Sequence, residues 1–93
     1  MNRLEKQVVS SISILADELR VLSLAGRHEG KILMKDIQEK NIDIQTPIYL
    51  IKLGYLKIDS KTEKDYPYCD YEITEDGKKY SHQVEEFLNY HFF

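Results

Sequence analysis

The fold of this chain is decided by residues 46–80, which read TPIYLIKLGYLKIDSKTEKDYPYCDYEITEDGKKY. Thr46 and Pro47 predict a helix start, because Thr caps a helix N-terminus and Pro fits the first helical position. This helix is apolar and ends at Gly54. The residues after it predict a β-hairpin, since β-rich segments stand on both sides of a polar turn. The parts of the hairpin are a strand at 55–59, a turn at 60–67 and a return strand at 68–73.

A long helix is predicted at each end of the chain. The helix at 3–25 carries one apolar face at alternating steps of four and three, formed by Val8, Ile12, Leu15, Leu19 and Leu22. Further apolar residues widen this face toward a second neighbour, namely Ile14, Val21 and Ala25. Thr74 caps the last helix, and two acidic residues follow in its first turn, where the helix dipole favours them. Its apolar face consists of Tyr80, Val84, Phe87, Leu88 and His91.

The middle of the chain completes the predicted order of elements. Residues 31–34 form a short strand or a loop, and residues 34–40 form a short helix that Asn41 breaks. Two short helices followed by a hairpin indicate a helix-turn-helix with a wing. We therefore expect one α+β domain, mainly helical, over residues 1–93. Its parts are an N-terminal helix at 1–26, the helix-turn-helix at 31–54, the wing at 55–73 and a C-terminal helix at 74–93.

Composition excludes several classes of protein. The chain has 93 residues, 42% of them hydrophobic and 31% charged, which is too apolar for a disordered segment. No apolar run reaches the ~18 residues of a membrane span, and no secretory signal opens the chain, so we expect an intracellular protein without a membrane partner. The three His and one Cys show no zinc spacing, and no catalytic motif occurs. We expect no enzyme, no metal, no cofactor and no small-molecule substrate.

Charge is segregated along the chain, whose net charge is −3. Residues 1–26 are balanced, and residues 27–64 carry eight Lys or Arg against six Asp or Glu. Residues 65–93 carry two Lys against seven acids. The segment that holds the predicted helix-turn-helix is therefore the only positive one.

The segments LIKLGYL at 50–56 and YEITEDGKKY at 71–80 resemble the winged-helix DNA-binding family, in particular its PadR- and MarR-like regulators. The resemblance covers about residues 30–80, and Ile73 stands where the family pattern has Leu. Size, the single Cys and the Ile/Lys/Glu-rich composition also resemble the small winged-helix proteins of turreted icosahedral viruses that infect hyperthermophilic archaea. The resemblance implies a protein that binds double-stranded DNA and regulates transcription, and the viral likeness implies the cytoplasm of a host cell.

The winged-helix resemblance indicates which residues would bind DNA. The recognition helix offers Gln45, Thr46, Tyr49 and Lys52 to the major groove. The wing offers Lys57, Lys61 and Lys64 to phosphates. A second basic group could contact the backbone and consists of Arg27, His28, Lys31 and Lys35. The simpler interpretation is a solvated helix face and a solubilising turn, because acids are interleaved with the wing lysines. A winged helix that binds a protein instead of DNA is the alternative function.

Apolar residues on both end helices predict a dimer interface, although packing within one chain is the simpler interpretation. The interface candidates are Val8, Ile12, Leu15, Leu19, Phe87, Tyr90 and Phe92. Cys69 is either a buried small hydrophobe or half of an intermolecular disulfide, because a lone Cys can pair only with another chain.

Overall fold

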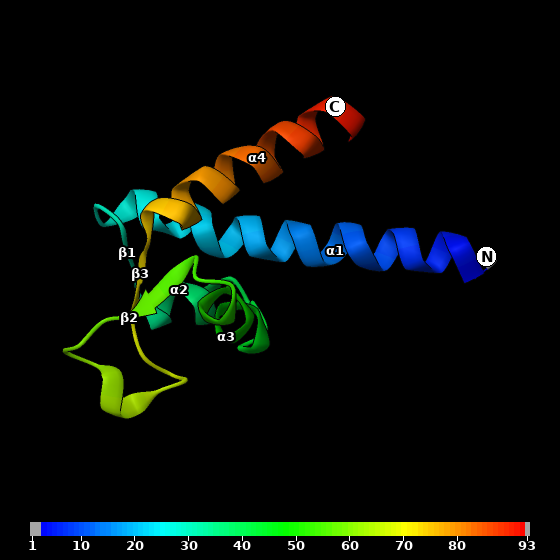
Figure 1. Ribbon diagram of the computed structural model, residues 1–93. Coiled ribbons are helices and arrows are strands. Elements are labelled where there is room, and N and C mark those ends of the chain that lie inside the picture. The colour runs from blue at the N-terminus through cyan, green and yellow to red at the C-terminus, as the bar shows by residue number, and fades with distance from the viewer. Residues whose placement is uncertain (1–2, 93) are drawn as a thin grey trace.

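The computed structural model describes the backbone of residues 3–92 and the side chains of residues 13–90 (Figure 1). The helices in this range are α1 (Arg3–Ser23), α2 (Met34–Glu39), α3 (Gln45–Lys52) and α4 (Glu75–Phe92). The strands are β1 (Lys31–Ile32), β2 (Leu56–Ile58) and β3 (Tyr71–Ile73), and short 3-10 turns lie at Leu24–Arg27 and Glu63–Asp65. The predicted mainly helical α+β class is confirmed.

The strands form one antiparallel sheet in the order β1-β3-β2. The hairpin of β2 and β3 was predicted, whereas the sequence left residues 31–34 open between strand and loop. β1 pairs with β3, so that Lys31 and Lys57 lie on either side of Glu72 in the centre of the sheet. The opposite face carries apolar residues that belong to or pack on the core, which are Ile32, Leu56, Ile58, Tyr71 and Ile73.

The return strand is shorter than predicted, and residues 59–70 form a long loop instead. The Tyr68 N–H donates to the Asp65 carbonyl at 2.8 Å, and the Asp70 N–H donates to Thr62 Oγ1 at 2.8 Å. These backbone groups are hydrogen-bonded within the loop and not to β2, so strand pairing begins only at Tyr71.

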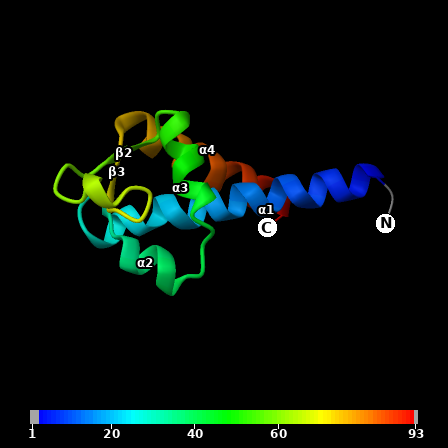
Figure 2. The same cartoon turned by 90° about the horizontal axis from the view of Figure 1, so that it is seen from below.

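One core cluster lies where the C-terminal half of α1 crosses the sheet and the other helices. Its fully buried side chains include Val21 and Leu22 of α1, Ile37 of α2 and Leu50 of α3. α4 lies on one side of α1, and α2 and α3 lie on the other (Figures 1 and 2). The N-terminal half of α1 extends past these elements, and the whole molecule measures 45 × 23 × 22 Å.

Both short helices end in the same motif, with a left-handed residue after the last turn. Gly54, at φ +83°, donates its N–H to the Ile51 carbonyl, while the Tyr55 N–H donates to the Leu50 carbonyl, both at 2.9 Å. This is the Schellman pattern that Gly favours. Asn41 does the same for α2 at φ +54°. The predicted ends at Gly54 and Asn41 are therefore confirmed.

α4 begins as predicted, at Thr74. The Gly77 N–H donates to Thr74 Oγ1 at 3.0 Å, and the same hydroxyl donates to the Gly54 carbonyl at 2.7 Å. A Cβ at Gly77 would lie 2.1 Å from the Tyr55 carbonyl oxygen, so only Gly lets the two segments approach this closely. One Thr thus joins the end of α3 to the start of α4.

α3 begins differently from the prediction, because Thr46 is not its N-cap. The helix begins at Gln45, whose N–H donates to Asp43 Oδ1 at 2.9 Å. Pro47 is then the third helical residue, and the first-turn N–H groups have no acceptor inside the helix. Its missing N–H therefore costs α3 no hydrogen bond, and the expectation that Pro47 must occupy the first position was wrong.

Candidate nucleic-acid interface

α3 buries one side and exposes the other. Pro47 and Leu50 are buried in the core, whereas Gln45, Tyr49 and Lys52 are exposed. Three of the four predicted recognition residues therefore share one exposed stripe. Ile48 is half-exposed and lies beside this stripe at the spacing i+3 from Gln45.

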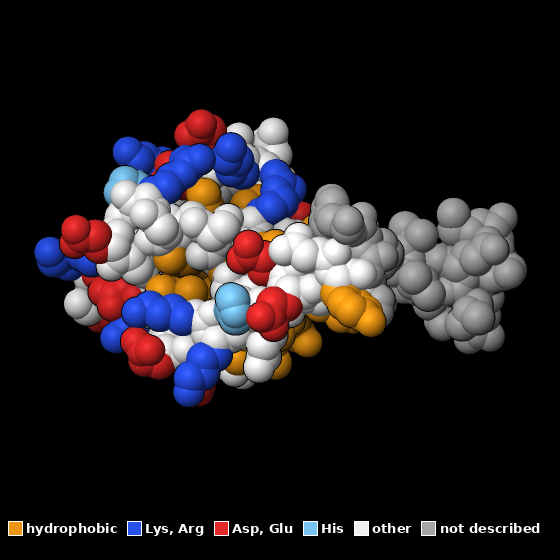
Figure 3. Space-filling view, turned by 90° about the horizontal axis from the view of Figure 1, so that it is seen from above, with side chains coloured by type: hydrophobic (Ala, Val, Ile, Leu, Met, Phe, Trp, Pro, Cys, Tyr) orange, Lys and Arg blue, Asp and Glu red, His pale blue; other side chains and the backbone are white. Residues whose placement is uncertain are grey.

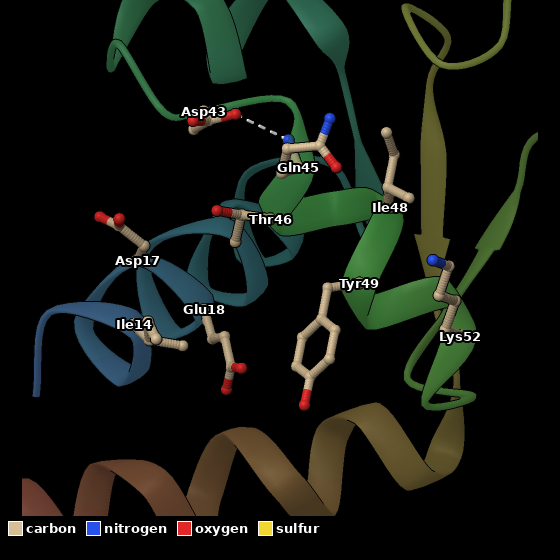
Figure 4. A pocket seen from close by; sticks show the side chains of 9 residues that line it. All are labelled: Ile14, Asp17, Glu18, Asp43, Gln45, Thr46, Ile48, Tyr49 and Lys52. Atoms are coloured by element: carbon tan, nitrogen blue, oxygen red, sulfur yellow. Dashed lines mark hydrogen bonds between the residues drawn. The ribbon is translucent and has the colours of Figure 1, made fainter. Parts of the chain in front are cut away.

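A groove of about 560 Å³ runs between α1 and α3 (Figure 4). Thr46 and Tyr49 line it from α3, and Figure 4 shows them on the side of α3 that faces α1. The groove is acidic, because three carboxylates and a single lysine line it, namely Asp17, Glu18, Asp43 and Lys52. The exposed stripe of α3 therefore borders both solvent and this groove.

The acidic wall of the groove was missed at the sequence level. Glu18 is 3% exposed and accepts a hydrogen bond from the Tyr80 hydroxyl of α4, whose ring stacks on Tyr55 at 4.2 Å. Burial and this hydrogen bond raise the pKa of Tyr80 above its ordinary value. A signal existed in the sequence: Glu18 stands four residues after Ile14 and three before Val21, inside the second apolar row of the helix.

The loop at 59–70 corresponds to the predicted wing, and its lysines differ in their surroundings. Lys57 Nζ lies 3.4 Å from Glu72 Oε2, so its charge is compensated across the hairpin. Lys61 and Lys64 are exposed, and neither forms an ion pair with any residue whose side chain is described. The loop is anchored at its base, where the Lys61 N–H donates to Asp59 Oδ1 at 3.1 Å.

Most of the second basic group lies at the surface but is paired with carboxylates of the chain, and the predicted contact with a phosphate backbone stays a prediction. Arg27 lies 3.5 Å and His28 3.2 Å from the carboxylate of Asp36, which is 5% exposed. Lys31 lies 3.8 Å from Asp59, which is 7% exposed. Arg27 and Lys31 thus compensate buried carboxylates, and the His28 ring lies beside the same Asp36. Of the predicted group, Lys35 alone is exposed without such a described partner.

The predicted dimer residues are divided between packed and exposed positions. Leu15 and Leu19 of α1 are half-buried, while Phe87 and Tyr90 of α4 are 44% and 86% exposed. Val8, Ile12 and Phe92 lie outside the residues whose side chains are described. Figure 3 shows hydrophobic side chains between charged ones on the face that carries α4.

Cys69 is 1% exposed and belongs to the core cluster, which agrees with the interpretation as a small buried hydrophobe. Burial raises the pKa of its thiol. A disulfide to a second chain would require this side chain to become exposed. The neighbouring Tyr71 is also fully buried and donates its hydroxyl hydrogen bond to the Pro67 carbonyl.

The described residues were also examined for a metal site and for a membrane-spanning helix, and the chain was compared with known proteins. In the described part of the chain, no three His, Cys, Asp or Glu side chains come together in a way that could hold a metal ion. None of the described helices combines the length and the apolar character needed to cross a membrane. No protein-family model, no curated protein and no solved structure matches this chain.

Proposed function

We propose that this chain is a winged-helix protein that binds double-stranded DNA as a homodimer and regulates transcription. The observation that carries the proposal is the placement of α3. Its core side is held by Pro47 and Leu50, and its other side presents Gln45, Tyr49 and Lys52 at the surface. A short helix held in this way by a preceding helix and a following sheet is the arrangement that inserts into a major groove.

The order of elements supports the same assignment. Helix, strand, two helices and two strands follow one another, and the three strands form a sheet in the order β1-β3-β2. The loop between β2 and β3 projects from the sheet, as a wing does (Figure 1). In the proposed complex Gln45 contacts base edges, while Lys52, Lys61 and Lys64 contact phosphates.

The shape of α1 supports the proposal of a homodimer. This helix has 21 residues, or about 31 Å at 1.5 Å per residue, and only its C-terminal half is covered by the other elements. The uncovered half contains the apolar sequence positions Val8 and Ile12. Pairing of two such helices about a two-fold axis would place two α3 helices for half-sites about one DNA turn apart.

The test is a fluorescence anisotropy titration of duplex DNA obtained by in vitro selection. We expect Lys61→Gln combined with Lys64→Gln to weaken binding about tenfold at ~50 mM salt and to reduce the salt slope by about 2, since each phosphate contact contributes about 1. Lys79→Gln is the control, because it removes an exposed lysine of α4 instead. No DNA binding at low salt, or equal losses in all variants, would contradict the proposal.

A protein-binding winged helix is the second candidate, and one observation favours it. Four basic side chains of the positive segment are committed to carboxylates within the chain, which are Arg27, His28, Lys31 and Lys57. The charge left for phosphates is therefore small. Lys52→Gln with Lys61→Gln distinguishes the two: a DNA-binding protein loses affinity and salt dependence, whereas an adaptor shows neither change because it does not bind the duplex.

A further inference from the structure

We infer that the groove between α1 and α3 is a binding site for a small aromatic organic cation, with Glu18 as the counter-ion of its ammonium group. The groove of about 560 Å³ falls in the ~300–1,000 Å³ range of small-molecule sites. Its lining combines a buried carboxylate, an aromatic ring and two isoleucines, which is the chemistry that such a cation requires.

The buried carboxylate is the first argument. Three acidic side chains are buried in the described part of the chain: Glu18, Asp36 and Asp59. Asp36 has Arg27 and His28 beside it, and Asp59 has Lys31. Glu18 is the most buried of the three, and its polar partner is the Tyr80 hydroxyl, without a cation from residues 13–90. Burying a carboxylate is costly unless it is paired. A cation bound in the groove would give Glu18 the charge partner that Asp36 and Asp59 receive from side chains of the chain itself.

The aromatic wall is the second argument. Tyr49 stands on the opposite side of the groove from Glu18 and is 49% exposed. Figure 4 shows its ring and the Glu18 side chain both directed toward α4, from α3 and α1 respectively. A ring face beside a carboxylate favours a cation over a neutral molecule, because the ring quadrupole and the negative charge attract it together.

The remaining lining sets the shape and polarity of the ligand. Ile14 is 55% exposed and supplies apolar surface for the body of a ligand beside Glu18. Ile48 also lines the groove, but Figure 4 shows it on the other side of α3. Asp17 is already paired with Arg20 at 3.2 Å, and one oxygen of Asp43 accepts the Gln45 N–H. Lys52 stands in the same lining and disfavours a dication or a long polyamine there. A single positive charge next to one aromatic ring fits this distribution best.

A cation bound in the groove would compete with DNA for side chains of α3. This competition rests on the proposed DNA-binding function, whereas the cation site itself does not. Gln45, Tyr49 and Lys52 line the groove and also form the exposed stripe of α3. A bound cation would therefore compete with DNA for the same side chains. The binding itself needs no DNA and is tested without it, so failure of the cation site and failure of DNA binding are separate results.

The test uses benzylammonium and its neutral analogue benzyl alcohol, titrated separately into the ¹⁵N-labelled protein and followed by NMR. We expect benzylammonium to bind about tenfold more tightly than benzyl alcohol, from one charge pair in a partly solvated groove. Amide shifts should concentrate at residues 14–18 and 43–52. Equal affinities, or shifts centred elsewhere, would overturn the inference.

Two variants assign the roles. Glu18→Gln keeps an acceptor for the Tyr80 hydroxyl but removes the charge, so the preference for benzylammonium should disappear, with circular dichroism as the check on folding. Tyr49→Ala changes an exposed ring and should weaken benzylammonium severalfold. Tyr66→Ala is its matched control, since Tyr66 is similarly exposed, at 44%, in the loop away from the groove. A preference that survives Glu18→Gln, or equal effects of the two Tyr variants, would exclude the site.

Discussion

The start of α4 and the start of α3 look alike in the sequence and differ in the structure. Each is marked by a Thr, Thr74 and Thr46. Thr74 accepts the Gly77 N–H and donates to the Gly54 carbonyl. Thr46 lines the groove toward α1, the N-cap position of α3 is Ile44, and the side chain of Asp43 accepts the Gln45 N–H. The same residue type is thus a structural link at one helix and part of a surface groove at the other.

The two helix starts have different roles: the start of α4 is tightly packed, whereas the start of α3 lies at the surface. The start of α4 is pressed against the Tyr55 carbonyl, so close that residue 77 has no room for a Cβ. The start of α3 has an exposed N-terminal residue, Gln45, beside a groove open to ligands. Substitutions at the first should change stability, and substitutions at the second should change binding.

The largest effect is expected at Gly77. Gly77→Ala would place a Cβ 2.1 Å from the Tyr55 carbonyl oxygen and 2.9 Å from the Ile73 side chain. We expect the free energy of unfolding to fall by about 3 kcal/mol, since backbone must move to relieve the overlap. Urea unfolding at fixed protein concentration measures it. Gly26→Ala is the control: nothing lies within 4 Å of its added Cβ, and we expect no loss. Similar losses of unfolding free energy in Gly77→Ala and Gly26→Ala would contradict this prediction.

The two threonines provide the next comparison. Thr74→Val keeps the shape but removes the cap and the bond to the Gly54 carbonyl, which should cost about 1–2 kcal/mol. Thr46→Val should stay within about 0.5 kcal/mol, because the Thr46 hydroxyl caps nothing. Thermal or urea unfolding of both variants checks this. A larger loss at Thr46 would show that the sequence prediction of its cap was right.

The hydrogen bond from the Gln45 N–H to Asp43 at the start of α3 can be tested in the same way. Asp43→Ala removes the acceptor of the Gln45 N–H and should destabilise the protein by about 1 kcal/mol. Asp43→Asn keeps a side-chain oxygen at that position and should recover most of this loss. If Asn were as damaging as Ala in urea unfolding, the charge of Asp43 and not its hydrogen bond would be the stabilising feature.

The smallest expected effect is a loss of folding stability at alkaline pH, caused by the titration of Tyr80 in α4. The raised pKa of Tyr80 means that the folded state holds its proton more strongly than the unfolded state. The resulting stability is complete below the ordinary Tyr pKa of about 10 and is lost as pH rises toward the higher pKa of the folded state. Tyr80→Phe keeps the ring but loses the hydroxyl. The variant should therefore have a lower unfolding free energy than the unaltered protein, and the difference should shrink above pH 10. A constant difference from pH 8 to 11 would contradict this.

Local patterns predicted most of the secondary structure. The helices at 3–25 and 34–40 and the ends at Asn41 and Gly54 are confirmed, because each depends on hydrogen bonds between residues only a few positions apart. The place of β1 beside β3 was not predictable in this way, since it joins Ile32 to Tyr71 across 39 positions. The long loop was missed because residues 68–73 form a segment rich in Tyr, which favours a strand, whereas the N–H groups of Tyr68 and Asp70 bond within the loop.

The candidate site was predicted only in part, for a related reason. Helical spacing placed Tyr49 and Lys52 on one face of α3, and both are exposed. The same spacing cannot show that α1 lies opposite them, nor that Asp36 and Asp59 draw in Arg27, His28 and Lys31. Ion pairs are set by distances in space, and in this chain several of them join residues far apart in sequence.

The sequence by itself determined the helices, the hairpin, the helix end at Gly54 and the cap at Thr74, because backbone geometry and capping depend on neighbouring residue types. The tertiary structure alone decided which charges are compensated and which are not. It placed cations beside Asp36 and Asp59 and left Glu18 with the Tyr80 hydroxyl in a groove beside α3. The physical reason is that burial and charge pairing depend on which elements pack together, and packing is a property of the whole fold.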